Sequence, residues 1–177
     1  AVHARQLFDI VKSLPGDEIS IERQDNFWLE LTSGKSRFRL VGMAPDEFPA
    51  LPAYGQVKTF RLPAALLTEM IDQTIFCVST DDNRHNLSGV FCTRPSEKML
   101  RMVSTDGHRL ARAVRKGDFG GLGKQAVIIP SKTIQALGRL AAEATSPVEI
   151  AVSTQRNHVA FHLRIGQNDV TVYSRLL

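Results

Sequence analysis

The chain has 177 residues, 43% of them hydrophobic and 23% charged, which excludes a disordered protein and leaves room for a buried core. No apolar run reaches membrane-spanning length, and Ala1 to Leu14 lacks the apolar core of a signal peptide. The net charge of +4 is uneven: residues 1–56 carry six Lys or Arg against eight Asp or Glu (−2), and residues 57–177 carry sixteen against ten (+6). The second segment therefore favours a polyanionic partner, although a basic surface that serves only solubility is the ordinary alternative.

The first predicted element is an amphipathic helix over Ala4–Leu14, because its apolar residues recur at spacings of three and four. Pro15 and Gly16 end this helix. Three strands are predicted next, at Ile19–Arg23, Phe27–Thr32 and Ser36–Val41. Two prolines and a glycine within Glu47–Gln56 then predict a linker.

After the linker, Lys58–Leu62 alternates as a strand, and Pro63 begins a second helix. Its inward residues are predicted to be Leu66, Leu67, Met70, Ile71, Ile75 and Val78. The next strands are predicted at Leu87–Cys92, Met99–Ser104 and Arg109–Val114. Cys77 and Cys92 each stand beside apolar residues, which predicts buried, reduced thiols in a cytoplasmic protein rather than a disulfide or a metal pair.

A glycine-rich loop over Gly117–Gly123 leads to a predicted strand at Ala126–Ile129. Pro130 begins a third helix, whose inward residues are predicted to be Ile134, Leu137, Leu140 and Ala141. The chain closes with strands predicted at Val148–Ser153, His158–Arg164 and Asp169–Arg175.

The predicted elements repeat along the chain. A strand, a helix and three strands over residues 57–114 recur over residues 126–177, and the first block resembles the last at an offset of about 128 residues. This predicts a pseudo-symmetric α+β architecture with sheets on one side and helices on the other. The first block lacks an opening strand and a partner half, and the sequence begins with Ala1, so we expect a fragment of a longer parent chain.

Two predicted helices carry polar residues opposite their apolar stripes. These are Arg5, Asp9 and Lys12 on the first helix and Lys132, Gln135 and Arg139 on the third. Their Lys and Arg side chains could contact phosphates of duplex DNA without reading its sequence, although a plain solvated face has the same spacing. The second helix favours the solvated face, since Glu69 and Asp72 would repel phosphate.

The stretch "STDGHRLARA", Ser104 to Ala113, combines an acid, an imidazole and two guanidiniums. Ser104, Asp106 and His108 are too close together in the chain to form a catalytic triad. The five histidines show no metal-ligand spacing, and the glycine-rich loop lacks the lysine of a phosphate-binding loop. The residues predict a turn between strands, in which Thr105 or Asp106 bonds the backbone and Gly107 takes positive φ.

The same stretch resembles the Thr-Asp-Gly-His-Arg-Leu-Ala signature of the bacterial sliding clamps, the β subunit of DNA polymerase III. "ARQLFDIVKSLP", "SGKSRFRLVGMAPDEFPALP", "NRHNLSGVF" and "VIIPSKTIQAL" resemble further segments of that family in the same order. The resemblance divides the chain into the second half of a first clamp domain, residues 1–56, and a complete middle domain, residues 57–177.

The resemblance implies a processivity factor of DNA replication, an accessory subunit of the polymerase complex with no catalytic residues or cofactor of its own. In this family three domains per subunit form a head-to-tail dimeric ring, with sheets outside and helices facing duplex DNA. Arg5, Lys12, Lys132 and Arg139 would then face DNA, whereas Thr68 and Glu69 stand where relatives often carry basic residues. Without a third domain, we expect this chain not to close a ring.

The resemblance also implies a cleft that binds short linear motifs of the Gln-x-x-Leu-Phe kind from the polymerase α subunit, the clamp loader and repair polymerases. Its residues here are expected to be Arg84, Leu87, Thr105, Gly107, His108, Arg109 and Leu110. The leucines would hold apolar anchors, Gly107 would admit the ligand to the backbone, and the basic side chains would donate hydrogen bonds. His85 and Asn86 replace an aromatic pair common in relatives.

Two other classes of function stay open at this point. A hydrolase would use His108 and Asp106. A DNA-binding protein that reads sequence would insert a helix into a groove, and the few Asn and Gln side chains on the predicted helix faces disfavour it.

Overall fold

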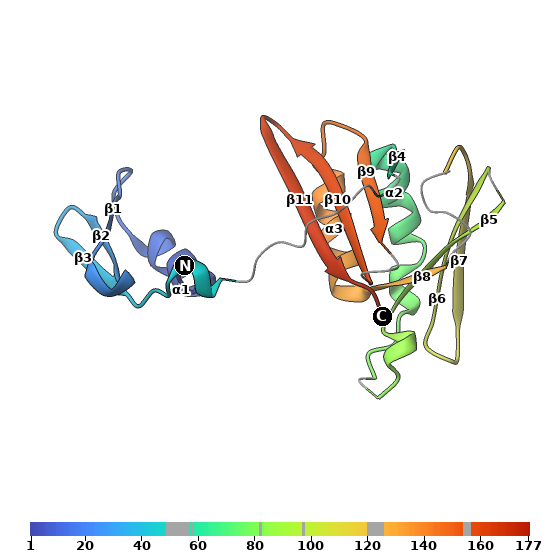
Figure 1. Ribbon diagram of the computed structural model, residues 1–177, viewed down its shortest axis with the longest axis horizontal. Coiled ribbons are helices and arrows are strands. Elements are labelled where there is room, and N and C mark those ends of the chain that lie inside the picture. Colours follow the sequence, from blue (N-terminus) through green and yellow to red (C-terminus); the bar gives the residue numbers. More distant parts are fainter. Residues whose placement is uncertain (49–56, 58, 82, 97, 120–125, 154–156) are drawn as a thin grey trace. The chain divides into compact units, whose positions relative to one another are not determined.

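We describe a computed structural model of the chain that covers residues 1–48, 57, 59–81, 83–96, 98–119, 126–153 and 157–177. The chain divides into two compact units, Ala1–Ala53 and Tyr54–Leu177 (Figure 1). Most of the predicted linker (residues 49–56), the predicted strand residue Lys58 and most of the glycine-rich loop (residues 120–125) lie outside the described residues. Each unit is described by itself.

The first unit contains one helix and one antiparallel sheet. Its elements are α1 (Ala4–Ser13), β1 (Ser20–Arg23), β2 (Leu29–Ser33) and β3 (Ser36–Leu40), with the sheet order β1-β2-β3. Short 3-10 helices span Asp25–Phe27 and Pro45–Glu47. The predicted helix and strands are confirmed, except that the second strand begins at Leu29. Asn26 and Phe27 have φ values of 59° and 63°, which a strand does not allow.

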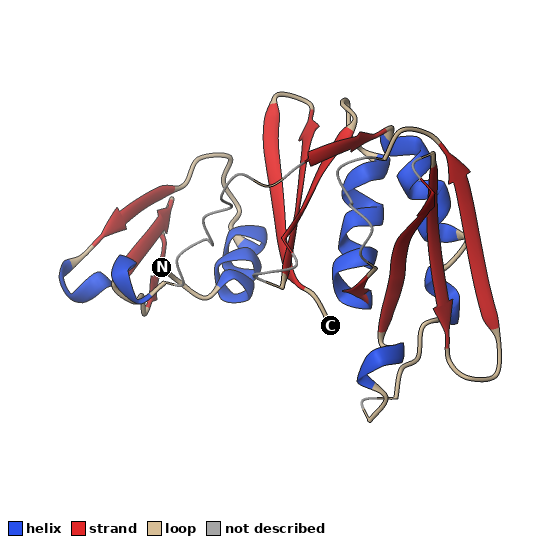
Figure 2. Cartoon of the chain, turned by 45° about the vertical axis from the view of Figure 1, so that its right-hand side comes forward, coloured by secondary structure: helices blue, strands red, loops and turns tan. Residues whose placement is uncertain are grey.

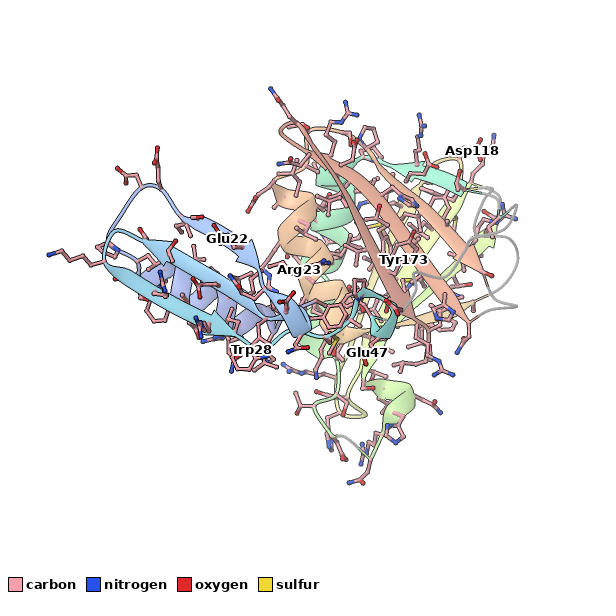
Figure 3. The ribbon with its side chains drawn as sticks, turned by 60° about the vertical axis from the view of Figure 1, so that its left-hand side comes forward. Glu22, Arg23, Trp28, Glu47, Asp118 and Tyr173 are labelled. Atoms are coloured by element: carbon pink, nitrogen blue, oxygen red, sulfur yellow. The ribbon has the colours of Figure 1, made fainter. Side chains whose placement is uncertain are left out.

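The first unit buries little of its apolar surface. Leu31 and Leu40 are buried, but no residue of α1 is. Phe8 of α1 is 61% exposed and Ile21 of β1 is 54% exposed, and Trp28, labelled in Figure 3, is 40% exposed. On the apolar stripe of α1, Leu7 and Ile10 are half-buried and Val11 is 39% exposed, so the stripe is only partly covered within this unit.

The second unit contains two helices and two four-stranded antiparallel sheets. Its first half consists of β4 (Thr59–Leu62), α2 (Ala64–Asp72), β5 (Gly89–Ser96), β6 (Met99–Thr105) and β7 (Leu110–Lys116). Its second half consists of β8 (Val127–Pro130), α3 (Ser131–Ala142), β9 (Val148–Ser153), β10 (His158–Ile165) and β11 (Asn168–Arg175). Most of these strands begin and end within one or two residues of their predicted bounds. The exception is β5, which extends to Ser96.

The two halves repeat the same order of elements and exchange their first strands. The sheets have the orders β7-β6-β5-β8 and β11-β10-β9-β4, so β8 completes the sheet of the first half and β4 that of the second. Leu62 pairs with Val148 in one exchange, and Gly89 pairs with Pro130 in the other. The predicted pseudo-symmetric α+β architecture is therefore confirmed.

The helices α2 and α3 lie side by side, with the two sheets flanking them (Figures 1 and 2). Leu67 and Met70 of α2 and Ile134 and Leu137 of α3 belong to one buried core with residues of both sheets. Burial of a side chain of this size stabilises the fold by about 1.5–3 kcal/mol. A side chain at Gly138 would reach within 3.3 Å of Ile71, so the absence of one lets the helices approach closely.

The second helix is shorter than predicted. α2 ends at Asp72, and Ile75 lies in a separate 3-10 helix, η3 (Ile75–Cys77), which Val78 follows. The hydroxyl of the buried Thr74 donates a hydrogen bond to the Met70 carbonyl. The Thr74 carbonyl in turn accepts a hydrogen bond from the Ser104 hydroxyl of β6. The Ser104 hydrogen bond ties the segment after α2 to β6, where apolar spacing alone predicts a longer helix.

Candidate functional site

The site is built on the tight turn between β6 and β7. Thr105 Oγ1 accepts from the Gly107 N–H at 3.1 Å and donates to the Arg109 carbonyl at 2.7 Å. Asp106 Oδ1 accepts from the backbone N–H groups of His108 and Arg109, each at 3.0 Å. Gly107 has φ +94°. The predicted turn is thus confirmed, with both side chains bonding the backbone.

Asp106 and Arg109 lock this turn to the rest of the unit. The Arg109 guanidinium donates through Nε to Asp106 Oδ2 at 3.0 Å and through Nη2 to the Phe76 carbonyl at 2.9 Å. The backbone N–H groups of Arg109 and His108, with the Arg109 side chain, hold the pKa of Asp106 well below its usual range. The carboxylate is therefore ionised at neutral pH, and both of its oxygens accept hydrogen bonds within the turn.

Arg84 connects a second loop to the turn. Its Nη1 donates to the Asp106 carbonyl at 3.2 Å, and its Nε lies 3.4 Å from Asp81 Oδ2. A Cβ at Gly107 would lie 3.0 Å from Arg84 Nη1, so the Arg84 guanidinium approaches the side of this glycine at which a ligand is expected to reach the backbone. Leu87 closes a 3-10 helix, η4 (His85–Leu87), in the same loop and is half-buried.

A hollow of about 460 Å³ lies beside the turn. Of the seven residues predicted for the cleft, Arg84, His108 and Arg109 line it. The other lining residues are Ile75, Phe76, Val78, Ser79, Thr80, Asp81, Asp106, Ser131 and Gln135. Phe76 is 57% exposed and is not among the cleft residues predicted from the sequence. The sequence signal for its exposure is that its position falls outside the apolar stripe of the second helix.

The remaining predicted cleft residues do not line this hollow. Leu110 begins β7 and is 64% exposed, so it offers an uncovered apolar side chain beside the turn. Thr105 ends β6 and is committed to the turn's hydrogen bonds. Leu87 and Gly107 lie on the two segments that Arg84 links.

The structure opposes a catalytic reading of the same stretch. Ser104 is 2% exposed, and its hydroxyl donates to the Thr74 carbonyl inside the unit. Asp106 has its oxygens bonded to the turn and to Arg109, so neither residue is placed to work with His108 as a triad. In the described part of the chain no three His, Cys, Asp or Glu side chains gather as metal ligands.

Both cysteines are free and buried, as predicted. Burial raises the pKa of the Cys92 thiol to about 12, which keeps it protonated and unreactive at neutral pH. Neither Cys77 nor Cys92 therefore contributes chemistry to the site.

The third helix presents the polar face predicted from its spacing. Lys132, Gln135 and Arg139 are all exposed on α3. Arg139 and Gln135 line an open groove between the helices, and Thr68 and Asp72 of α2 line its other side. This face carries two cations and is accessible to a large ligand.

Ion pairs alter the charge of the other predicted helix faces. Arg115 of β7 binds the Glu69 carboxylate of α2, so the repulsion expected from Glu69 is partly neutralised. Arg5 of α1 pairs with Asp9 at 3.3 Å on an exposed surface, where such a pair is weak. Lys12 is exposed in the last turn of α1.

Within the described residues, every helix is too short or too polar to cross a membrane.

Two family models match the chain: "DNA polymerase III beta subunit, N-terminal domain" over residues 1–52 and "DNA polymerase III beta subunit, central domain" over residues 61–177.

The chain is similar to curated beta sliding clamps. It is 37% identical to that of Halalkalibacterium halodurans over 179 residues and 33% identical to that of Bacillus subtilis over 176 residues. Each alignment covers 99% of this chain, which spans only 45% of the length of either relative.

Solved structures show the same similarity. The DNA polymerase sliding clamp of Bacillus subtilis superposes with a TM-score of 0.83 at 33% identity, covering 99% of this chain and 44% of that one. The DNA polymerase III subunit beta of Pseudomonas aeruginosa gives 0.82 at 31% identity, covering 99% and 47%.

Proposed function

The chain belongs to the DNA polymerase III beta subunit family, the bacterial sliding clamps, and on this premise we propose that it is part of a replication processivity factor. The clamp would encircle duplex DNA and tether the replicative polymerase. The agreement of fold and sequence over 99% of the chain supports this proposal.

We place residues 1–56 in the second half of the first clamp domain and residues 57–177 in the middle domain. The separate family matches to residues 1–52 and 61–177 support the division. The exposed Phe8 and the partly covered apolar stripe of α1 are consistent with a unit that packs against another half in the assembled ring. The full subunit would form a homodimeric ring in the cytoplasm, while this chain would not close one alone.

The partner-binding cleft is proposed at the turn between β6 and β7. The observation that carries it is the locked Thr-Asp-Gly-His-Arg-Leu turn, in which Asp106 satisfies the backbone and leaves Leu110 exposed. An exposed Leu beside basic side chains suits a short motif with Leu and Phe anchors and polar neighbours. Arg84, Leu87, Thr105, Gly107, His108 and Arg109 complete the proposed site.

The DNA-facing surface is proposed on α1 and α3, through Arg5, Lys12, Lys132 and Arg139. Lys132 and Arg139 are exposed on one face, and Arg115 offsets Glu69 on the neighbouring helix. Few, exposed cations fit weak, sequence-independent contacts with phosphates, which a sliding ring needs.

The proposed role requires no catalytic group, because a ring acts by topology while its bound partner performs the chemistry. The commitment of Ser104 and Asp106 to structural hydrogen bonds supports this accessory role over a hydrolase. Polymerases, the clamp loader and repair polymerases would compete for the same cleft through their linear motifs.

The test is a titration of a fluorescent Gln-x-x-Leu-Phe peptide, followed by anisotropy. We expect binding by the chain and its loss in Leu87→Ala/Leu110→Ala. Leu177→Ala is the matched control, because Leu177 is also exposed and lies outside the proposed cleft. Equal binding by the double variant and the control would refute the assignment of the cleft.

A further inference from the structure

The outward face of the β7-β6-β5-β8 sheet combines apolar and basic side chains. Because side chains alternate along a strand, the buried Leu100, Met102 and Ala113 define the inward face. The outward side carries the half-buried apolar residues Phe91, Val103, Val114 and Ile128. It also carries Arg101, Arg112 and Lys116. We call these seven residues the basic sheet face.

The charge of this face is of one sign. None of the outward residues on the described parts of these four strands is acidic. Arg112 and Lys116 are exposed. Arg101 is half-buried and its Nε is buried, so the accessible cations of this face are those of Arg112 and Lys116.

The basic sheet face is continuous with the candidate cleft. Thr105 pairs with Leu110, Val103 with Arg112, and Met99 with Lys116, so the same face runs along β6 and β7 from the turn. At about 3.4 Å per residue, Arg112 lies roughly 7 Å and Lys116 roughly 20 Å from Leu110 along the strand. A peptide of about six extended residues would cover that length.

We propose that the basic sheet face binds an acidic and apolar segment that flanks the linear motif of a clamp partner. The proposal rests on the proposed function, because the motif itself occupies the cleft at Leu110. Carboxylates of the flanking segment pair with Arg112 and Lys116, and its apolar side chains contact Val103 and Val114. Partners with acidic flanks are thereby favoured over partners with neutral or basic ones.

The experiment compares matched fluorescent peptides by anisotropy. Each contains a Gln-x-x-Leu-Phe motif with a six-residue flank of alternating Glu and Leu, placed before or after the motif. The counterparts have Gln in place of each Glu. We expect one of the two Glu peptides to bind about fivefold tighter than its Gln counterpart in low salt, and the advantage to shrink at 0.5 M salt.

The Arg112→Gln/Lys116→Gln variant should lose this advantage and bind the Gln peptide unchanged. Arg164→Gln/Arg175→Gln, with the same change in net charge on the other sheet, should keep it. Equal affinities of the Glu and Gln peptides, or an equal loss in both variants, would overturn the basic sheet face and leave the cleft standing. Binding of none of the peptides would overturn the cleft and the sheet face together.

Discussion

The Arg109 guanidinium lies 5.9 Å from the centre of the Phe76 ring and donates to the carbonyl of the same residue at 2.9 Å. It also binds Asp106, so one side chain joins η3 to the turn between β6 and β7. Arg109 is expected from sequence to donate to a ligand. In the structure its Nε donates to Asp106 and its Nη2 donates to the Phe76 carbonyl. Arg109 therefore positions the turn.

Phe76→Ala should weaken binding of the Gln-x-x-Leu-Phe peptide, because Arg109 loses the ring over which it lies. A cation–π contact at an exposed site contributes about 0.5–1 kcal/mol, so we expect affinity to fall by roughly two- to fivefold. Phe76→Tyr keeps an aromatic face and should bind nearly as the parent does. Phe8→Ala in the first unit is the matched control, and a loss of the same size there would argue against the role of Phe76.

Gly107→Ala should destabilise the second unit. A φ of +94° strains any residue with a Cβ, and that Cβ would also meet Arg84 at 3.0 Å. We expect the free energy of unfolding to fall by about 1–3 kcal/mol, measured by urea denaturation. Gly166→Ala, at φ +57° with open space around it, should cost less. An equal cost at both positions would mean that neither the larger φ nor the contact with Arg84 adds strain at Gly107.

Asp106 should stabilise the fold only while it is ionised. Its pKa is lowered in the folded state, so its contribution is complete above the unfolded-state pKa of about 3.9 and is lost as pH falls through the lower folded-state pKa. Asp106→Asn should therefore be less stable than the parent at pH 7, by a margin that is constant down to about pH 5 and narrows below about pH 4. Urea midpoints at several pH values measure the margin, with Asp169→Asn as an exposed control. A margin independent of pH would contradict the assignment.

Lys132→Gln/Arg139→Gln should weaken binding of duplex DNA to the same extent for unrelated sequences. Each lost phosphate contact should reduce the slope of log affinity against log salt by about 0.9. Electrophoretic mobility shifts at several salt concentrations measure this slope. Arg164→Gln/Arg175→Gln removes two charges from β10 and β11 and should leave the slope unchanged. A preferred DNA sequence would instead point to base readout.

The sequence by itself determines the element order, the repeat and the turn. Apolar spacing, Pro63, Pro130 and the turn residues Thr105 to Gly107 act over a few neighbouring positions, so their local structure can be predicted from their order. The family is also evident in the sequence, because several motifs occur in the right order over the whole chain, and the family matches confirm it.

Only the tertiary structure decides which side chains meet around that turn. Ser104 bonds the carbonyl of Thr74, thirty residues away, just after α2 ends, and Arg109 lies over the ring of Phe76. Arg84 approaches Gly107, and Arg115 partly neutralises Glu69 from the end of another strand. These contacts join segments distant in the chain, and their geometry follows from how the strands pair and the helices pack, which local periodicity does not encode.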